Sequence, residues 1–223
     1  MPDVRILTFH GIGTPDRSLE PGEAPFWVGV DQFISILDRV ATHPDRTSFA
    51  ITFDDSNSSD LRIAAPHLER RGLRGTFFVL TGRIGQRGSL DADDVRELMM
   101  SGMFIGNHGV THRDWTRLKR LELLHELIAA RMALEKICRR PIEAAAIPFG
   151  RYNAAVLRAL RTTGYHTVYS SDRGTANPAA FLKPRTSIRN DTTEVELERI
   201  LSGRLPLLRK MHRNISMRVK QFS

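Results

Sequence analysis

The sequence predicts a single α/β domain in which about seven strand–helix units form a closed or nearly closed barrel. An open doubly wound sheet is the alternative. Short β-branched and aromatic runs alternate with helical segments along the chain, which is the pattern of a mainly parallel sheet. Several of these apolar runs end abruptly in polar residues, as strands do where α/β sheets carry their chemistry. The sequence contains no internal repeat, low-complexity segment or interdomain linker.

In the first half of the chain, apolar patterning and stop signals define three strands and two helices. A loop rich in Gly and Pro follows the first strand, and Gly72 ends the second helix. The first helix is expected to bury one face, which carries Phe33, Ile34, Leu37 and Val40. The predicted elements are a strand over 4–9, a helix over 30–41, a strand over 49–53, a helix over 60–71 and a strand over 74–80.

The second half continues the alternation. Asp91 can cap a helix that Gly102 ends, and Gly164 ends a later helix. The predicted helices cover 91–100, 116–138, 154–163 and 193–201. The predicted strands cover 103–106, 143–147 and 166–170, with a further strand over 184–188.

Composition places the chain among soluble globular proteins. Its 223 residues are 41% hydrophobic and 26% charged, which suits one domain with a large core. The single cysteine, Cys138, excludes an internal disulfide and fits a reducing compartment. The N-terminal apolar run is too short for a secretory signal, and no stretch of about 18 apolar residues occurs. The expected location is therefore the cytoplasm.

The net charge of +8 is concentrated at the C-terminal end. Residues 203–223 hold six Lys and Arg residues and no acid, so we divide the chain into a domain over 1–202 and a basic tail over 203–223. Such a tail helix either lies at an anionic membrane surface or packs its apolar side on the barrel. No recognition motif for nucleic acid accompanies the charge. The apolar residues at helical spacing are Leu208, Met211, Ile215, Val219 and Phe222.

Polar side chains at three strand ends predict a metal-dependent hydrolase. Asp54 and Asp55 end one strand, and two like charges side by side need a cation or a shared proton. His108 and His112 follow another strand with the spacing of a histidine pair that can bind one ion. One carboxylate with two histidines suits a catalytic divalent metal, most simply zinc. The second carboxylate would then act as general base in hydrolysis of an amide or ester.

The residues also match a known family. The chain resembles the NodB-homology polysaccharide deacetylases, which are metal-dependent carbohydrate esterases. The resemblance covers roughly 4–201 in the family's order of motifs. The matching stretches are T-F-D-D at Thr52 to Asp55, G-T-F-F-V at Gly75 to Val79, G-N-H-G-V-T-H at Gly106 to His112, P-F-G-R-Y-N at Pro148 to Asn153, and Gly164-Tyr165.

This resemblance implies a distorted (β/α) barrel and hydrolysis of an acetamido group on an amino sugar of a glycan or glycan precursor. By the same resemblance, Asp54 matches the catalytic base. The metal ligands match Asp55, His108 and His112. Pro148, Phe149 and Gly150 match the motif that forms a wall of the substrate groove, where a backbone N–H can hold an oxyanion.

Two departures from the family pattern bear on the mechanism. Many members carry an arginine that orients the base, but this chain has Ala144, Ala145 and Ala146 in that region. A sub-branch of the family with a Y-P-[YF]-G motif also lacks this arginine, and the I-P-F-G of this chain is similar to that motif. Arg185 either supplies this cation or forms a surface ion pair. The late segment lacks the family's general-acid histidine, and His10 either takes that role, as in circularly permuted relatives, or caps a strand.

Three functions follow from these patterns. The first is N-deacetylation of an amino sugar. The second keeps the site but acts on a formamido sugar or a cyclic amide. The third is a glycan-binding protein without catalysis, which the missing arginine and late histidine favour and the complete set of ligands opposes.

Overall fold

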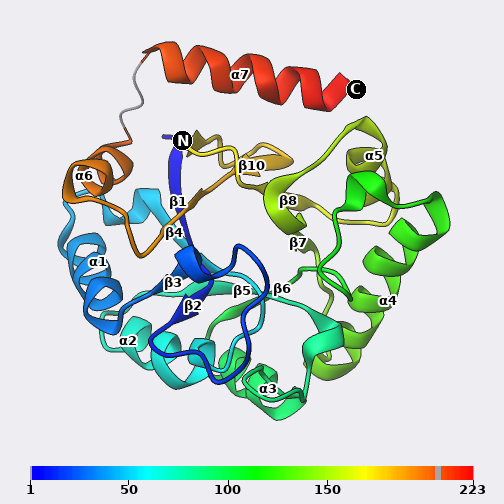
Figure 1. Ribbon diagram of the computed structural model, residues 1–223, viewed down its shortest axis with the longest axis horizontal. Helices are drawn as coiled ribbons and strands as arrows, with labels where there is room; N and C mark the ends of the chain where they lie inside the picture. Colours follow the sequence, from blue (N-terminus) through cyan, green and yellow to red (C-terminus); the bar gives the residue numbers. More distant parts are fainter. Residues whose placement is uncertain (1, 204–206, 223) are drawn as a thin grey trace.

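The barrel wall is a parallel sheet whose strands follow the order β10-β8-β7-β6-β5-β4-β1-β11. A computed structural model describes the backbone of residues 2–203 and 207–222 and the side chains of 2–203 and 215–222. The main strands are β1 (Val4–Phe9), β4 (Phe49–Phe53), β5 (Gly75–Val79), β6 (Phe104–Asn107), β7 (Ala144–Ala146) and β8 (Thr167–Ser170). The predicted strands are thus confirmed with small shifts at their ends, and the helices surround them (Figure 1).

One short segment closes the barrel. Its first piece, β10 (Leu182–Pro184), pairs with β8, and its second piece, β11 (Thr186–Ser187), pairs with β1. Only Arg185 lies between the two pieces, and its N–H donates to the carbonyl of Ser170. The two edges of the sheet are therefore joined through one stretch of chain. This arrangement confirms the predicted barrel and excludes the open sheet.

Within the described residues, six helices cover the outside of the barrel. They are α1 (Val30–Thr42), α2 (Ala65–Glu69), α3 (Ala92–Met100), α4 (Arg120–Cys138), α5 (Ala154–Thr162) and α6 (Glu194–Ser202). Two hydrophobic clusters fill the space beneath them, one mainly under α1 to α3 and one under α4 and α5. Asp91 caps α3 as predicted, through a capping box with Asp94.

Helix α1 buries a slightly different face from the predicted one. Phe33, Leu37 and Val40 are buried, but the fourth buried residue is Ile36, and Ile34 is half-buried. Positions 33, 36, 37 and 40 form a single stripe with helical spacing, whereas Ile34 lies about 100° around the helix from Phe33. The prediction of Ile34 in the core is therefore wrong.

Two helices begin differently from the prediction. The helix expected over 60–71 starts with a π-helical turn at Asp60–Ala64 before α2. The helix expected from 116 starts at Arg120, after a 3₁₀ turn at Trp115–Arg117. The loop over 11–25 begins with the short strand β2 (Gly11–Ile12). This strand pairs with β3 (Trp27–Val28), which follows the loop.

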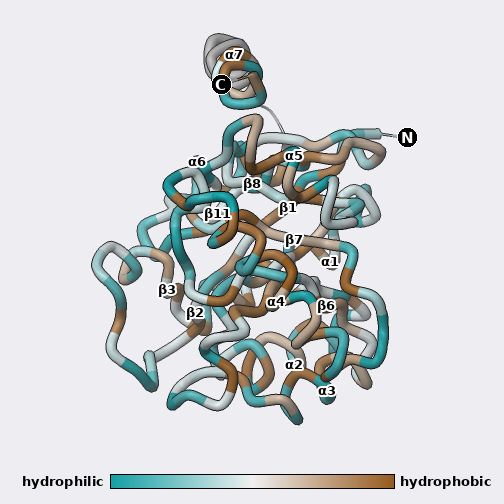
Figure 2. Tube along the Cα trace, turned by 90° about the vertical axis from the view of Figure 1, so that its right-hand side faces the viewer, coloured by the Kyte–Doolittle hydropathy of each residue, from teal (hydrophilic) through white to brown (hydrophobic). Residues whose placement is uncertain are grey.

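The last helix, α7 (Leu207–Phe222), lies outside the barrel in both views (Figures 1 and 2). Met217 packs against the cluster beneath α5, and Lys220 Nζ lies 2.7 Å from Asp172 Oδ1. These contacts match the alternative in which the tail packs on the barrel. The packed face differs from the predicted stripe, because Ile215, Val219 and Phe222 are exposed. The side chains of Leu208 and Met211 lie outside the described residues.

Among the described residues, no helix is long and apolar enough to cross a membrane. The division of the chain into a domain over 1–202 and a tail over 203–223 stays a prediction. So does the cytoplasmic location.

Candidate metal centre and active site

Asp54 and Asp55 stand in the turn that follows β4. The Asp54 N–H donates to the carbonyl of Phe9, so the end of β4 is tied to β1. Asp55 and Ser56 then adopt positive φ angles of 77° and 60°, which non-glycine residues rarely adopt and which often mark functional turns. The Ser56 Oγ accepts a hydrogen bond of 2.6 Å from the Leu80 N–H. The hydroxyl therefore anchors the turn to the segment after β5.

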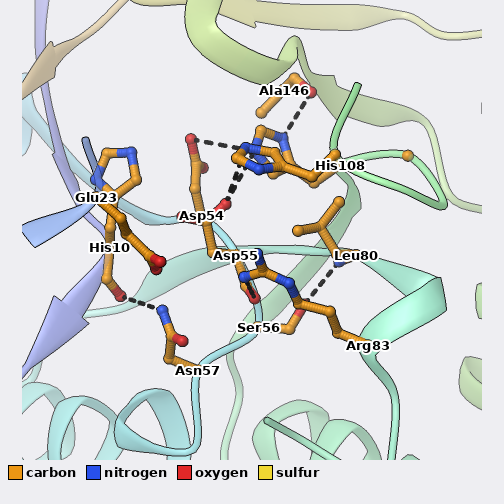
Figure 3. A network of polar contacts seen from close by, with 12 residues as sticks. His10, Glu23, Asp54, Asp55, Ser56, Asn57, Leu80, Arg83, His108 and Ala146 are labelled. Atoms are coloured by element: carbon orange, nitrogen blue, oxygen red, sulfur yellow. Dashed lines mark hydrogen bonds and ion pairs between the residues drawn. The ribbon is translucent and has the colours of Figure 1, made fainter. Parts of the chain in front are cut away.

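The two histidines of the third motif aim their Nε2 atoms at Asp55. His108 Nε2 and His112 Nε2 each lie 3.4 Å from Asp55 Oδ1. His108 Nδ1 lies 2.9 Å from the carbonyl of Ala146, and His112 Nδ1 lies 3.1 Å from a Glu20 oxygen. Because Nδ1–H donates to these acceptors, the Nε2 lone pairs are left for a ligand. Figure 3 shows His108 between Ala146 and the two aspartates.

The residues present fit a divalent metal ion. Asp55, His108 and His112 each offer one donor atom, and these atoms lie within 4.8 Å of one another. Asp55 Oδ1 is buried and has no hydrogen-bond partner among the described residues, so its lone pairs are available to bind an ion. Burial alone would lower the pKa of His108, but the charges of Asp54 and Asp55 raise it overall. The same negative field attracts a metal cation.

Arg185 reaches Asp54 from the segment that closes the barrel. Its Nη1 and Nη2 donate to Asp54 Oδ1 and Oδ2 over 2.8 and 2.7 Å, which is a two-pronged ion pair. Both side chains are buried, at 1% and 4% exposure. Burial alone would raise the pKa of Asp54, but the charges of Arg185 and His108 and the hydrogen bonds from Arg185 lower it overall. The ion pair that Arg185 forms is therefore buried, and the alternative of a surface ion pair is wrong.

His10 follows β1 and lines the same cleft as Asp54. Its ring packs against Phe26, with ring centroids 4.9 Å apart, and its Nδ1 is buried without a partner among the described residues. Burial lowers the pKa of His10, although the charges of Asp55 and Asp54 act in the opposite direction. The backbone carbonyl of His10 accepts a bond from Asn57, as Figure 3 shows. The side chain is thus held beside the carboxylates without a fixed proton partner.

The P-F-G motif contributes one residue, Phe149, to the lining of the cleft. Pro148 is buried, whereas Phe149 is 53% exposed and its ring centroid lies 4.5 Å from that of His112. Gly150 has a φ of 63°, and a Cβ there would come within 2.6 Å of the Ser171 nitrogen, so glycine is required. The cleft has a volume of about 480 Å³ and contains all of the predicted polar site residues except Arg185, which lies behind Asp54.

Two acidic residues escaped prediction. Glu20 holds His112 Nδ1 and also pairs with Arg83. Glu126 of α4 is buried, and its carboxylate accepts hydrogen bonds from the amides of Val110 and Thr111 over 2.7 and 3.2 Å. Glu20 gave no sequence signal, because it is far from its partner in the chain. Glu126 could have been found from the sequence, because it is an acidic residue on the apolar face of the helix predicted over 116–138.

Two residues that follow predicted strand ends, Trp115 and Asp172, do not line the cleft. Trp115 is 1% exposed and belongs to the core beneath α5. Asp172 accepts hydrogen bonds from Tyr152 Oη and Ser170 Oγ and pairs with Lys220, so it links β8 to α7.

Comparison with known proteins agrees with the family resemblance and with the fold. The family model described as "Polysaccharide deacetylase" matches residues 41–168. YxkH of Bacillus subtilis (strain 168), which carries the provisional name of a polysaccharide deacetylase, is 25% identical over 184 residues. The match covers 77% of this chain and 66% of YxkH, so the chain spans just under two thirds of that relative.

Two solved structures share the fold. The Streptococcus pyogenes deacetylase PplD, in complex with acetate, has a TM-score of 0.77 at 23% identity, covering 92% of this chain and 99% of that one. IcaB from Ammonifex degensii has a TM-score of 0.73 at 17% identity, covering 90% and 96%. These similarities support the barrel and give no support to the membrane contact considered for the tail.

Proposed function

This chain belongs to the polysaccharide deacetylase family, and on that premise we propose that it removes an N-acetyl group from an amino sugar with one bound divalent metal ion. The observation that carries the proposal is the convergence of Asp55, His108 and His112 on one point, with Asp54 beside them. Such a site can hold a cation while a carboxylate next to it handles a proton.

The three ligands would hold the ion, most simply zinc. When bound, a divalent ion lowers the pKa of water and polarises a carbonyl group. Ala146 and Glu20 support this role, because each fixes the tautomer of one histidine.

Asp54 would act as the general base that takes the proton from the attacking water. Arg185 would hold the Asp54 carboxylate in place and keep it ionised. The missing arginine of the family was one argument for a binding protein without catalysis. In this proposal Arg185, from the barrel-closing segment, takes the place of that arginine, so the argument loses its force.

His10 would act as the general acid that gives a proton to the nitrogen as the C–N bond breaks. The position of His10 supports this role, because its ring lines the cleft beside Asp54, and an imidazole can pass on a proton that it has received. For the oxyanion of the tetrahedral intermediate, we assign the Phe149 N–H, because the next two amides donate to the carbonyls of Ile147 and Pro148.

The test is release of acetate from N-acetylglucosamine oligomers by metal-loaded protein. We expect turnover that a chelator abolishes and added metal restores.

Replacement of Asp54 by Asn should lower turnover at least about a hundredfold, as loss of a general base does, while metal content is unchanged. His10→Ala should lower turnover on the amide substrate with its metal retained. Stoichiometric metal without acetate release from any acetylated sugar would favour the glycan-binding alternative. Faster release of formate from N-formylglucosamine than of acetate would favour the formamido sugar.

A further inference from the structure

One side of the cleft is lined by three arginines from neighbouring strand ends. Arg151 follows β7, Arg173 follows β8, and Arg189 follows β11. Because β7 pairs with β8, and β8 pairs with the segment that runs into β11, these three loops are adjacent. The three side chains thus line the cleft from adjacent loops, and we call them together the arginine wall.

Each arginine of the wall pairs with a carboxylate that lies outside the cleft lining. Arg151 lies 3.0 Å from Asp114, Arg189 lies 2.9 Å from Asp191, and Arg173 lies 3.5 Å from Glu196. The three arginine side chains are 60%, 40% and 56% exposed, in that order. Ion pairs this exposed to water contribute little to stability, so a ligand anion can compete for these guanidiniums at low cost.

The acidic residues of the cleft are already balanced by other cations. Glu23 pairs with Arg17, and Glu20 pairs with Arg83. Asp54 pairs with Arg185, and Asp55 faces the metal site. These cationic partners of the cleft carboxylates therefore lie outside the arginine wall.

We propose that the arginine wall binds a phosphate group carried by the amino-sugar substrate, an inference that rests on the proposed deacetylase function. A carboxylate presents two oxygens in one plane, which a single guanidinium can occupy. A phosphate presents its oxygens in several directions, which suits guanidiniums from three loops. Ser171 and Ser187 line the same region and add hydroxyl donors.

Binding of two products tests the inference without any turnover. Glucosamine 1-phosphate and glucosamine differ only in the phosphate, and neither has an acetyl group to lose. We expect calorimetry on the metal-loaded protein to give a Kd at least about tenfold lower for the phosphorylated sugar, as a hydrogen bond to a charged group provides. This preference should weaken as salt is raised.

Variants of the arginine wall show where the phosphate binds. Arg151→Gln, Arg173→Gln and Arg189→Gln should each reduce the preference, and the triple variant should remove it. Arg140→Gln, an exposed arginine beyond the end of α4, is the matched control and should leave the preference intact. Equal affinity for the two sugars in the wild type would overturn the inference. So would a preference that survives in the triple variant, because the phosphate would then bind elsewhere, for example to the metal.

Turnover separates this inference from the proposed function and identifies the source of the phosphate. Acetate release would be compared for N-acetylglucosamine, its 1-phosphate, its nucleoside diphosphate conjugate and its polyprenyl diphosphate conjugate. The conjugate with the highest kcat/KM identifies the source, provided that the advantage falls in the triple variant. A highest kcat/KM for the neutral sugar would contradict the inference and leave the deacetylase function intact. Absence of acetate from all four would contradict the deacetylase function, while the binding data would still decide whether the wall selects phosphate.

Discussion

At the scale of single residues, the site is a set of buried charges, each balanced by a specific partner. The negative charge of Asp54 is balanced by the Arg185 guanidinium, which donates two hydrogen bonds to it. The guanidinium carbon also lies over the ring of Phe78, 5.2 Å from the ring centroid. Removing one member of such a pair leaves an uncompensated charge, which costs far more than the net value of the pair. Arg185 therefore supports both folding and the proposed base.

Replacing Arg185 with Met should lower the free energy of unfolding by about 3–5 kcal/mol, because Asp54 is left buried and unpaired. Denaturant unfolding of metal-free protein would measure the loss. Adding Asp54→Asn to this variant should recover a large part of it, since the unpaired charge is then gone. A double variant no more stable than Arg185→Met would contradict the assigned pairing.

Asp60 is a buried carboxyl group without such compensation. Its pKa is raised well above the ordinary value, first by burial and then by the charges of Asp55 and Asp54. Its Oδ1 has no hydrogen-bond partner among the described residues. The folded protein therefore keeps a proton on Asp60 that the unfolded chain releases above its ordinary pKa of about 3.9.

This difference predicts a pH-dependent loss of stability. Below the ordinary pKa the protonated Asp60 costs nothing, and the free energy of unfolding then falls with rising pH until the raised pKa is passed. Asp60→Asn should abolish this contribution, so its advantage over wild type should grow from pH 4 to pH 8, measured by urea unfolding without metal. Glu69→Gln, an exposed acid at the end of α2, is the control. An advantage independent of pH would show that Asp60 is already ionised in the fold.

At the scale of elements, helix α4 fixes the loop that carries both histidines. Glu126 accepts hydrogen bonds from the amides of Val110 and Thr111 and from the Thr111 hydroxyl. Gly109 has a φ of 93°, and a Cβ there would come within 2.5 Å of the Glu126 carboxylate. The loop is thus shaped by a buried acceptor, and the arrangement of the proposed metal ligands depends on a residue that is not one of them.

Glu126→Gln should weaken metal affinity about tenfold or more, as changes behind metal ligands typically do. The amide NH₂ group that replaces one oxygen cannot accept the bonds that the loop donates. Competition with a chromogenic chelator measures the affinity. The control is Glu122→Gln on the same helix, which is partly exposed and keeps an acceptor at the start of the helix. Equal metal affinity in the Glu126 and Glu122 variants would contradict the role of the loop.

At the scale of the whole molecule, barrel closure brings distant parts of the sequence to one place. Strand ends could be predicted from apolar patterning, and their adjacency in a parallel sheet brought Asp55, His108 and His112 together in the prediction. The pairing of Arg185 with Asp54 could be suspected only from the absence of another cation. It depends on how the segment 182–187 crosses from β8 to β1, which no local pattern encodes.

Other features were beyond local patterns for similar reasons. Glu20 meets His112 across 92 residues of sequence, through a loop without regular structure. The face of α7 that meets the barrel is selected by Asp172, a carboxylate already held by Tyr152 and Ser170 that takes Lys220 as its cation. Helical periodicity predicted that helix but not the side chains by which it packs.

The central claim is that Asp55, His108 and His112 from separate loops bind one metal ion. Metal content of purified full-length protein, measured by mass spectrometry after loading and desalting, tests it most directly. We predict one equivalent in the wild type and in Asp54→Asn, and loss of the metal in His108→Ala and in His112→Ala. Stoichiometric metal retained in either histidine variant would contradict the claim.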